Sequence, residues 1–432
     1  MKITDFRSLL DPGASQASDA PTPLTGRELE ELISPVSCED FVNSYFSRVS
    51  LSTKGHPQKF DKIFSWGKLA RALVRGQKVS DARYNITASF TGGEDTGNPR
   101  GMIKATDDKV VELLNAGATI CITNIHMADP ALAQWAQAIR AQLNFTGTVG
   151  VNCYVSPDAS GLPMHYDKRV ATTLQISGSK RWKFSTGPAK PWPNTNEAYQ
   201  GGGKDGKDVG KLPPEMEFRE VELNPGDVLC LPAGAWHSAR GIGHSLALNI
   251  YFAPRSYLDQ FMPLLQNFAA QSEAWRGGPP ATTEKIHGKM PKEVSAYMRE
   301  RLDEFHRMAK EAINQDALVA PWLNSLTHSP SSGWEPAPKL PLPEISPDQR
   351  FSIATPSLRF LEFKDKVMVP CDHGVLRFPV ALTPFLERLA STSTSFTVPE
   401  ALSWQQKSGG ASTDDIITCL QNLYINGVLR LA

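Results

Sequence analysis

The sequence lacks the features that mark a membrane or secreted protein. Its six cysteines include no Cys-x-x-Cys pair and no closely spaced set, so we expect reduced core thiols rather than a disulfide scaffold. No apolar run is long enough to cross a membrane, and the first residues lack the apolar stretch of a signal peptide. Charge is balanced, with 45 basic and 45 acidic residues, which gives no global attraction to nucleic acid or anionic lipid. The composition therefore predicts a cytoplasmic protein of several domains, with no membrane and no nucleic acid as partner.

Against this background the triplet His165-Tyr166-Asp167 and the later His237 are the most informative residues. Side chains two apart in a strand share a face, so His165 and Asp167 would project together. His237 follows a Pro225-Gly226-Asp227 turn and an apolar segment, 228–231, which we expect to be a strand beside the first. Two imidazoles and one carboxylate leave metal positions open, as non-haem Fe(II) requires. A zinc hydrolase could use a similar set, and a lone His-x-Asp is more commonly a surface pair.

A predicted β-hairpin follows this triplet. Residues 170–176 are rich in β-branched side chains, 177–179 form the predicted turn, and 180–184 form the return strand. On the return strand Lys180 shares a face with two aromatic residues. If that face is the inner one, the ammonium needs an anion, because an unpaired buried charge is costly. The alternative is that Lys180 reaches the rim of the barrel.

These residues resemble a known family, the ribosomal oxygenases, which are cupin-fold JmjC-type 2-oxoglutarate-dependent protein hydroxylases. The resemblance covers about a quarter of the chain, and the order and spacing of its motifs are specific. It is carried by Asn152-Cys153-Tyr154, Pro163-Met164-His165-Tyr166-Asp167, Leu174-Gln175-Ile176-Ser177-Gly178-Ser179-Lys180-Arg181-Trp182, Leu223-Asn224-Pro225-Gly226-Asp227-Val228-Leu229-Cys230-Leu231-Pro232 and Trp236-His237-Ser238-Ala239.

The resemblance implies an α+β protein with a double-stranded β-helix barrel and flanking helices. In it His165, Asp167 and His237 would bind Fe(II), and Lys180 would bind the distal carboxylate of 2-oxoglutarate. Further residues lie on segments that line the cofactor pocket or, for the last, the substrate mouth: Asn152, Thr173, Asn249 and Tyr154. The family commonly has a bulky residue in place of Thr173, which predicts a differently shaped pocket. A stray His126 is expected to be structural rather than a fourth ligand.

Composition and periodicity predict the domain organisation. The expected parts are a flexible leader (1–36), a JmjC/cupin catalytic domain (37–254) with an insertion (186–214), a helical region (255–328), a linker with six prolines (329–348) and a winged-helix-like domain (349–432). In the resembled family the helical region makes dimers. The last predicted helix is not basic, which favours a structural or protein-docking role over DNA binding. The insertion is predicted to be a loop, either passive or covering the substrate, since it contains Trp192 and Tyr199.

The resemblance predicts an Fe(II)- and 2-oxoglutarate-dependent dioxygenase that uses dioxygen to hydroxylate a side chain of a protein or peptide. Ribosomal proteins are the first substrate class to test, and a homodimer is expected. Two alternatives stay open. One is a JmjC-type lysine demethylase, although many of these carry Glu where this chain has Asp167. The other is a non-catalytic metal-binding cupin scaffold, which need not retain Lys180.

Overall fold

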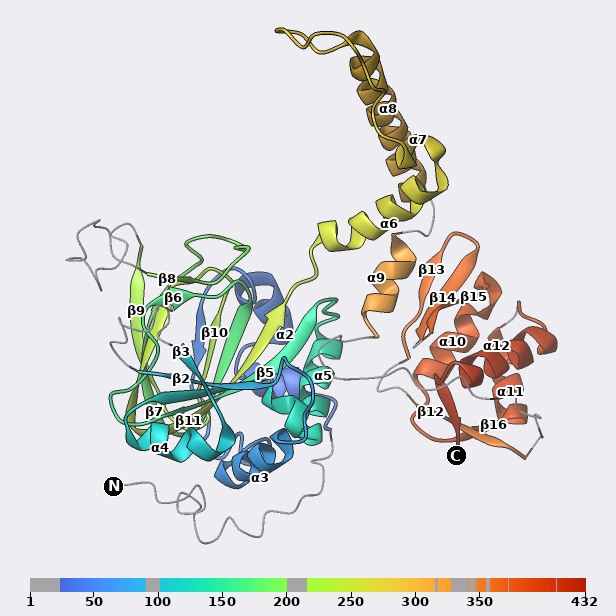
Figure 1. Ribbon diagram of the computed structural model, residues 1–432. Coiled ribbons are helices and arrows are strands. Elements are labelled where there is room, and N and C mark those ends of the chain that lie inside the picture. The colour runs from blue at the N-terminus through green and yellow to red at the C-terminus, as the bar shows by residue number, and fades with distance from the viewer. Residues whose placement is uncertain are drawn as a thin grey trace. The chain divides into compact units, whose positions relative to one another are not determined.

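The computed structural model describes residues 24–432, apart from 91–101, 200–215, 315–317, 328–340, 342–345, 347, 355–357, 372 and 409. Contacts divide the chain into two compact units, one that ends at Pro254 and one that begins at Arg255 and includes the C-terminus (Figure 1). Most of the predicted linker, the first part of the predicted leader and the second half of the predicted insertion lie outside the described residues. No helix in the described part of the chain is long and apolar enough to cross a membrane.

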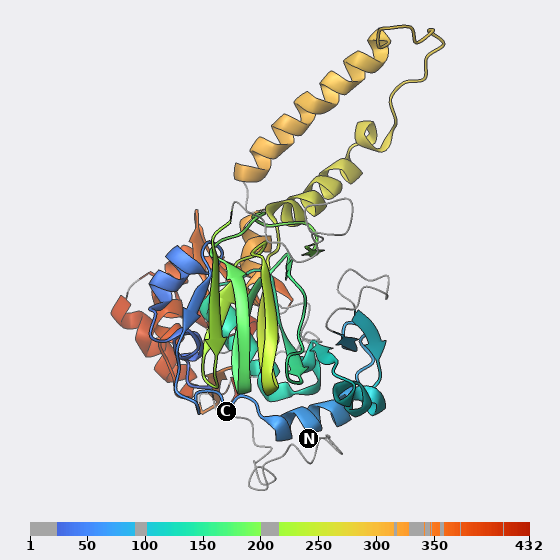
Figure 2. The ribbon, with the colours of Figure 1, turned by 90° about the vertical axis from the view of Figure 1, so that its left-hand side faces the viewer.

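The first unit is organised around one large sheet, in which eleven strands join among the described residues. The order along its main path is β1-β10-β7-β11-β5-β4-β2-β3, and Figure 2 shows many of these strands side by side. The strands are β1 (Leu51–Thr53), β2 (Asn85–Ser89), β3 (Met102–Ala105), β4 (Thr119–Thr123), β5 (Thr148–Ser156), β6 (His165–Tyr166), β7 (Val170–Ser185), β8 (Glu197–Ala198), β9 (Phe218–Leu223), β10 (Val228–Leu231) and β11 (His237–Ala253). The antiparallel cupin-type architecture agrees with the predicted barrel and its flanking helices.

The two long strands β7 and β11 correct the predicted hairpin. They pair antiparallel from Val170 opposite Phe252 to Phe184 opposite His237, so residues 170–185 form one bent strand rather than two paired ones. The first arm of β7 also pairs with β10 and the second arm with β9. The residues expected to form a tight turn instead form an irregular corner, with Gly178 at φ +62° and a register shift in β11 opposite. Composition alone does not separate such a corner from a turn.

Helices cover the sheet and extend its core. They are α1 (Glu28–Ile33), α2 (Cys38–Asp40), α3 (Trp66–Gly76), α4 (Val110–Asn115) and α5 (Pro130–Gln142). The side chain of Ser65 accepts a hydrogen bond from the Lys68 N–H, so it caps α3 as the preference of serine for this position predicts. Leu29 and Leu32 of α1 are buried in the same core as the sheet. The prediction of a flexible leader up to residue 36 is therefore wrong for its last part, because the apolar face of α1 packs.

The second unit has a helical part and a C-terminal part (Figure 1). The helices are α6 (Tyr257–Gln271), α7 (Glu273–Arg276), α8 (Lys292–Asn314) and α9 (Val319–Ser325). The C-terminal part contains β12 (Arg350–Ile353), β13 (Leu361–Phe363), β14 (Lys366–Cys371), β15 (Gly374–Pro379), α10 (Thr383–Ala390), β16 (Phe396–Thr397), α11 (Val398–Ser408), α12 (Thr413–Ile425) and β17 (Leu429–Leu431). Its strands form two three-stranded sheets among the described residues, β16-β12-β17 and β13-β14-β15. The last predicted helix of this region corresponds to α12.

Candidate metal centre

Strand pairing brings the three predicted metal ligands together. His165 in β6 lies directly opposite His237, the first residue of β11, and their ring centroids are 4.2 Å apart. Oδ2 of Asp167 lies 4.0 Å from Nε2 of His237, and one ligand atom from each of the three residues lies within 4.8 Å of the others. The strand beside the His-x-Asp segment is therefore β11, not the preceding β10 as the sequence suggested.

Backbone contacts hold the loop that carries Asp167 near His237. The N–H of Gly234 donates to the carbonyl of Asp167 at 2.8 Å. Gly234 has φ +86°, and a Cβ there would meet the Lys190 carbonyl oxygen at 1.9 Å. The turn before β11 thus needs glycine at this position, both for its backbone conformation and for the close approach of a neighbouring chain segment.

Two carbonyl groups set the orientation of the imidazoles. Nδ1 of His165 lies 2.7 Å from the Pro163 oxygen, and Nδ1 of His237 lies 2.9 Å from the Ala235 oxygen. A carbonyl can only accept, so each Nδ1 carries the proton and Nε2 carries the lone pair. This is the arrangement by which a hydrogen bond from the second ring nitrogen orients a histidine metal ligand. Both imidazoles are buried and Asp167 is mostly buried, which favours coordination geometry over solvation.

The buried Lys180 lies in the wall of the same cavity. It is only 3% exposed, and its Nζ lies 5.7 Å from the ring centroid of Tyr154. Burial lowers the Lys180 pKa to about 8, against a smaller opposing effect of Cys153. Among the described residues, no carboxylate forms an ion pair with this ammonium. The predicted inward position is confirmed, and the alternative of a lysine at the barrel rim is wrong.

The cavity gathers most of the predicted pocket residues. Its lining consists of Thr119, Tyr154, Gly161, Leu162, His165, Asp167, Thr173, Lys180, Trp182, His237, Ala239, Ala247 and Asn249. Thr173 and Asn249 face each other across β7 and β11, and Nδ2 of Asn249 donates to Oγ1 of Thr173 at 3.3 Å. Asn152 does not belong to this lining. Its Oδ1 accepts the N–H of Asn124 at 3.1 Å, so the amide stabilises the adjacent loop.

The described part of the insertion pairs with the strand that carries His165. β8 pairs with β6, with Ala198 opposite His165, and the Tyr166 hydroxyl donates to Glu197. The ring of Tyr199 packs edge-on against Trp236, at 5.5 Å between centroids. This segment was expected to be a loop, and its paired strand is a correction. Trp192, by contrast, is exposed.

Comparison with known proteins places these residues in a family. Residues 126–259 match the family model described as the JmjC domain, a segment that includes the three clustered residues and Lys180. The chain contains a JmjC domain.

The JmjC domain has relatives among curated proteins. The chain is 24% identical over 293 residues to the uncharacterized protein YxbC of Bacillus subtilis, which covers 64% of this chain and 85% of YxbC. It is 28% identical over 287 residues to the bifunctional lysine-specific demethylase and histidyl-hydroxylase NO66 of Drosophila erecta, again over 64% of this chain but only 42% of NO66. The match thus spans less than half the length of NO66.

A solved structure shares the fold over nearly the whole chain. The Escherichia coli ribosomal oxygenase YcfD aligns with a TM-score of 0.53 at 15% identity, over 92% of this chain and 98% of YcfD. A structure of YcfD with cobalt and 2-oxoglutarate aligns with a TM-score of 0.51 at 16% identity. At this identity the likeness establishes the fold of the JmjC domain and its surroundings, not their chemistry.

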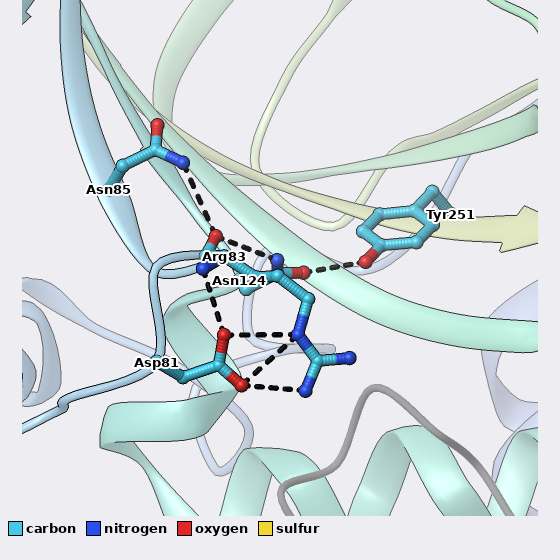
Figure 3. A network of polar contacts seen from close by, with 5 residues as sticks. All are labelled: Asp81, Arg83, Asn85, Asn124 and Tyr251. Carbon is cyan, nitrogen blue, oxygen red and sulfur yellow. Dashed lines mark hydrogen bonds and ion pairs between the residues drawn. The ribbon is translucent and has the colours of Figure 1, made fainter.

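Sequence reasoning missed a polar network at the edge of the JmjC domain (Figure 3). Asn124, with φ 56°, donates from Nδ2 to the Arg83 carbonyl at 2.9 Å and accepts the Tyr251 hydroxyl at 2.5 Å. The guanidinium of Arg169 lies over the Tyr251 ring, 3.7 Å from its centroid. The sequence signal that pointed to Arg169 was the basic pair Lys168-Arg169 directly after Asp167. His126, nearby, is buried, and its Nδ1 accepts the Val151 N–H at 3.1 Å, which is a structural contact.

Proposed function

We propose that this protein is an Fe(II)- and 2-oxoglutarate-dependent oxygenase that hydroxylates a side chain of a protein or peptide. The observation that carries the proposal is the pairing of a two-histidine, one-carboxylate set with a buried lysine in one cavity. The ligand types and the fixed Nε2 orientation fit Fe(II), because imidazole and carboxylate suit this ion and three protein ligands leave coordination positions open. The lysine fits 2-oxoglutarate, because a buried ammonium requires an anion.

Each residue then has a definite task. Fe(II) with 2-oxoglutarate and dioxygen supplies the oxidising power to attack an unactivated C–H bond, which no side chain possesses. His165, Asp167 and His237 hold the metal on one side. Lys180 binds the distal carboxylate of 2-oxoglutarate from the cavity wall, while Thr173 and Asn249 hold each other in place beside it.

The remaining wall excludes water and receives the substrate. Trp182 and Ala239 line the cavity with apolar surface and belong to one buried cluster. Exclusion of water strengthens charge interactions within the site and protects reactive species from side reactions. Tyr154, whose pKa burial holds well above its usual value, stays protonated and offers an O–H donor near the substrate mouth.

The relatives support a protein substrate. NO66 is a histidyl-hydroxylase and lysine-specific demethylase, and YcfD is a ribosomal oxygenase. Ribosomal proteins are therefore the first substrate class to test. Lysine demethylation is the second candidate, because the NO66 relative has both activities. Asp167 favours hydroxylation, since many demethylases of this group carry Glu at that position.

The second unit supports two further parts of the proposal. Helices α6 and α8 expose large apolar side chains, among them Leu258 and Leu302, which suits a homodimer contact.

The C-terminal part, with three helices and the small sheet β16-β12-β17, is proposed to be a winged-helix-like module. Its helix α12 has Asp414 and Asp415 in its first turn, so we propose protein docking rather than nucleic-acid binding. A cytoplasmic location completes the proposal.

Anaerobic titration of the Fe(II)-loaded protein with 2-oxoglutarate tests the cofactor assignment. We expect the weak visible charge-transfer band of the chelate in the wild type and its loss in His237→Ala. His244→Ala is the matched control, because His244 lies on the same strand outside the cluster. Absence of the band in iron-loaded wild type would contradict the proposal and favour a binding scaffold or another metal. Where the band forms, peptide products that gain one oxygen separate hydroxylation from demethylation.

A further inference from the structure

A second cation lies close in the sequence to the metal centre. Arg169 is two residues after Asp167 and immediately before β7. Its side chain is half-buried, and its guanidinium carbon lies 3.7 Å from the centroid of the Tyr251 ring. This distance is well within the range of a cation–π contact, so the ring covers one side of the guanidinium.

The ring that supports Arg169 is held rigidly. Tyr251 lies opposite Gly150 in β5, and a Cβ at Gly150 would come within 2.4 Å of the Tyr251 hydroxyl oxygen. The hydroxyl donates to Oδ1 of Asn124 (Figure 3). The Asn124 N–H in turn donates to Oδ1 of Asn152. A glycine that makes room and two amides that lock the phenol together form a fixed platform for the arginine.

The platform lies on the strand that also contributes Asn249 to the reaction cavity. Tyr251 and Asn249 are two apart on β11 and so share a strand face, and Asn249 lines the cavity. The charge of Arg169 also reaches Tyr154 in the cavity wall, where it opposes the burial that raises the Tyr154 pKa. Arg169 and Tyr251 are not part of the cavity lining themselves, but they lie two residues from Asp167 and Asn249, which are.

The positive charge of Arg169 has no acidic counterpart. Among the described residues, none provides a carboxylate within ion-pair distance of its guanidinium, whereas the neighbouring Arg83 is bonded to both oxygens of Asp81. In the proposed loaded site, the charges of Fe(II) and Lys180 are balanced by Asp167 and the two carboxylates of 2-oxoglutarate. The charge on Arg169 therefore remains available to a substrate.

We propose that Arg169 on the Tyr251 ring binds a carboxylate side chain of the substrate, close in sequence to the residue that is oxidised. The planar fork of a guanidinium matches a carboxylate with two parallel hydrogen bonds, and such charge-assisted pairs are stronger than neutral ones. The partner is therefore a peptide segment with Asp or Glu near its target residue. This inference rests on the proposed function, since it assigns the substrate class of the same site.

Peptide selection by the full-length protein tests the assignment. The probes are two pools of short synthetic peptides with a randomised centre, one with Asp and Glu in the flanks and one with Asn and Gln at the same positions. Binding is measured anaerobically on Fe(II)- and 2-oxoglutarate-loaded protein. We expect the wild type to prefer the acidic pool by about tenfold or more, since a hydrogen bond to a charged group contributes about 1.5–3 kcal/mol.

Variants separate recognition from mere packing. Arg169→Gln is expected to lose the preference, Arg169→Lys to keep part of it, and Arg169→Glu to prefer a third pool with Lys and Arg flanks. Lys168→Gln is the matched control, because it removes the same charge from the adjacent, exposed residue. An unchanged preference in Arg169→Gln, or an equal loss in Lys168→Gln, would overturn the proposal. So would a selective loss of 2-oxoglutarate affinity in Arg169→Gln, which would assign Arg169 to the cofactor.

The same experiment tests the oxygenase activity and the peptide recognition separately. Peptide binding is read without turnover, and the chelate band is read separately in each variant. If the chelate band is absent but the protein still prefers the acidic pool, the oxygenase proposal is contradicted and the recognition site remains supported. A normal band with no acidic preference would remove the recognition site alone.

Discussion

The barrel and the α6–α8 region use burial in opposite ways. The barrel encloses polar side chains such as His165, Lys180 and His237, which are each at most 5% exposed. Helices α6 and α8 instead leave large apolar side chains in contact with solvent, and Leu258 and Leu302 are 63% and 66% exposed. A folded chain normally does the reverse in both places, because desolvating polar groups and exposing apolar ones both cost free energy.

The comparison shows where each region needs something from outside the chain. A buried, oriented polar set is compensated by a ligand that completes it, here a metal and an anion. An exposed apolar stripe is compensated by a second apolar surface. The first kind of exception therefore predicts chemistry, and the second predicts association.

Lys180→Ala should show the largest effect on the barrel side. Loss of the ammonium removes a charge-assisted contact worth about 1.5–3 kcal/mol, which corresponds to roughly a 10–100-fold rise in KM for 2-oxoglutarate. Fe(II) binding should be unchanged, because Lys180 is not among the clustered ligands. Lys183→Ala on the exposed face of the same strand is the control, since its contact to Glu220 is a surface ion pair. An unchanged KM in Lys180→Ala would remove the assignment.

The same residue gives a signed pH dependence. The Lys180 pKa falls from 10.5 in the unfolded chain to about 8 in the ligand-free fold, because burial disfavours the charged form. Affinity for 2-oxoglutarate should decline as pH rises above about 8, where the ammonium loses its proton. Between these two pKa values the unfolded chain binds more protons, so stability rises with pH through that window. Lys180→Met should therefore stabilise the ligand-free protein more at pH 7 than at pH 10, as thermal unfolding would measure.

The success of the sequence prediction differs between these residues for physical reasons. His165 and Asp167 were predictable as a pair because they are only two residues apart and carry metal-binding side chains. His237 was predictable from the motif that resembles the family, but the strand that brings it to His165 was not, because that pairing joins distant segments. Lys180 was predictable as an inward cation because its strand neighbours are aromatic. The corner at Gly178 was not, since whether two arms pair with each other or with β9 and β10 depends on distant strands.

Arg169 and Asn152 show the same limit. The platform of Arg169 depends on β5 and β11 lying in a register that places Gly150 opposite Tyr251. Asn152 was assigned to the pocket because its segment was expected to line the pocket. Its amide oxygen instead accepts a hydrogen bond from the backbone N–H of Asn124, a residue with positive φ. Both contacts join residues far apart in sequence, and no local pattern specifies them.

Leu302→Asp tests the association half of the contrast. If α6 and α8 form a homodimer contact, a charge in the apolar stripe should weaken the dimer by about tenfold or more, since about 1.4 kcal/mol corresponds to each factor of ten. Light scattering across a dilution series would measure this. Ala296→Asp adds the same charge at an exposed position of the same helix and should leave the dimer intact. A wild-type protein that is monomeric at all concentrations would break the comparison, because the stripe would then need a different partner.

Thr173→Val should have the smallest effect and tests how finely the barrel interior is arranged. The substitution keeps the β-branched shape and removes the hydroxyl that accepts from Nδ2 of Asn249. A hydrogen bond of this kind contributes about 0.5–1.5 kcal/mol, so we expect a roughly 2–10-fold loss of 2-oxoglutarate affinity in the anaerobic titration. Thr172→Val is the control, because Thr172 is the preceding residue of β7 and does not line the cavity. Equal effects of the two substitutions would mean that Thr173 acts only through packing of the strand. The polar contacts that matter for 2-oxoglutarate affinity would then be limited to Lys180 and the metal ligands.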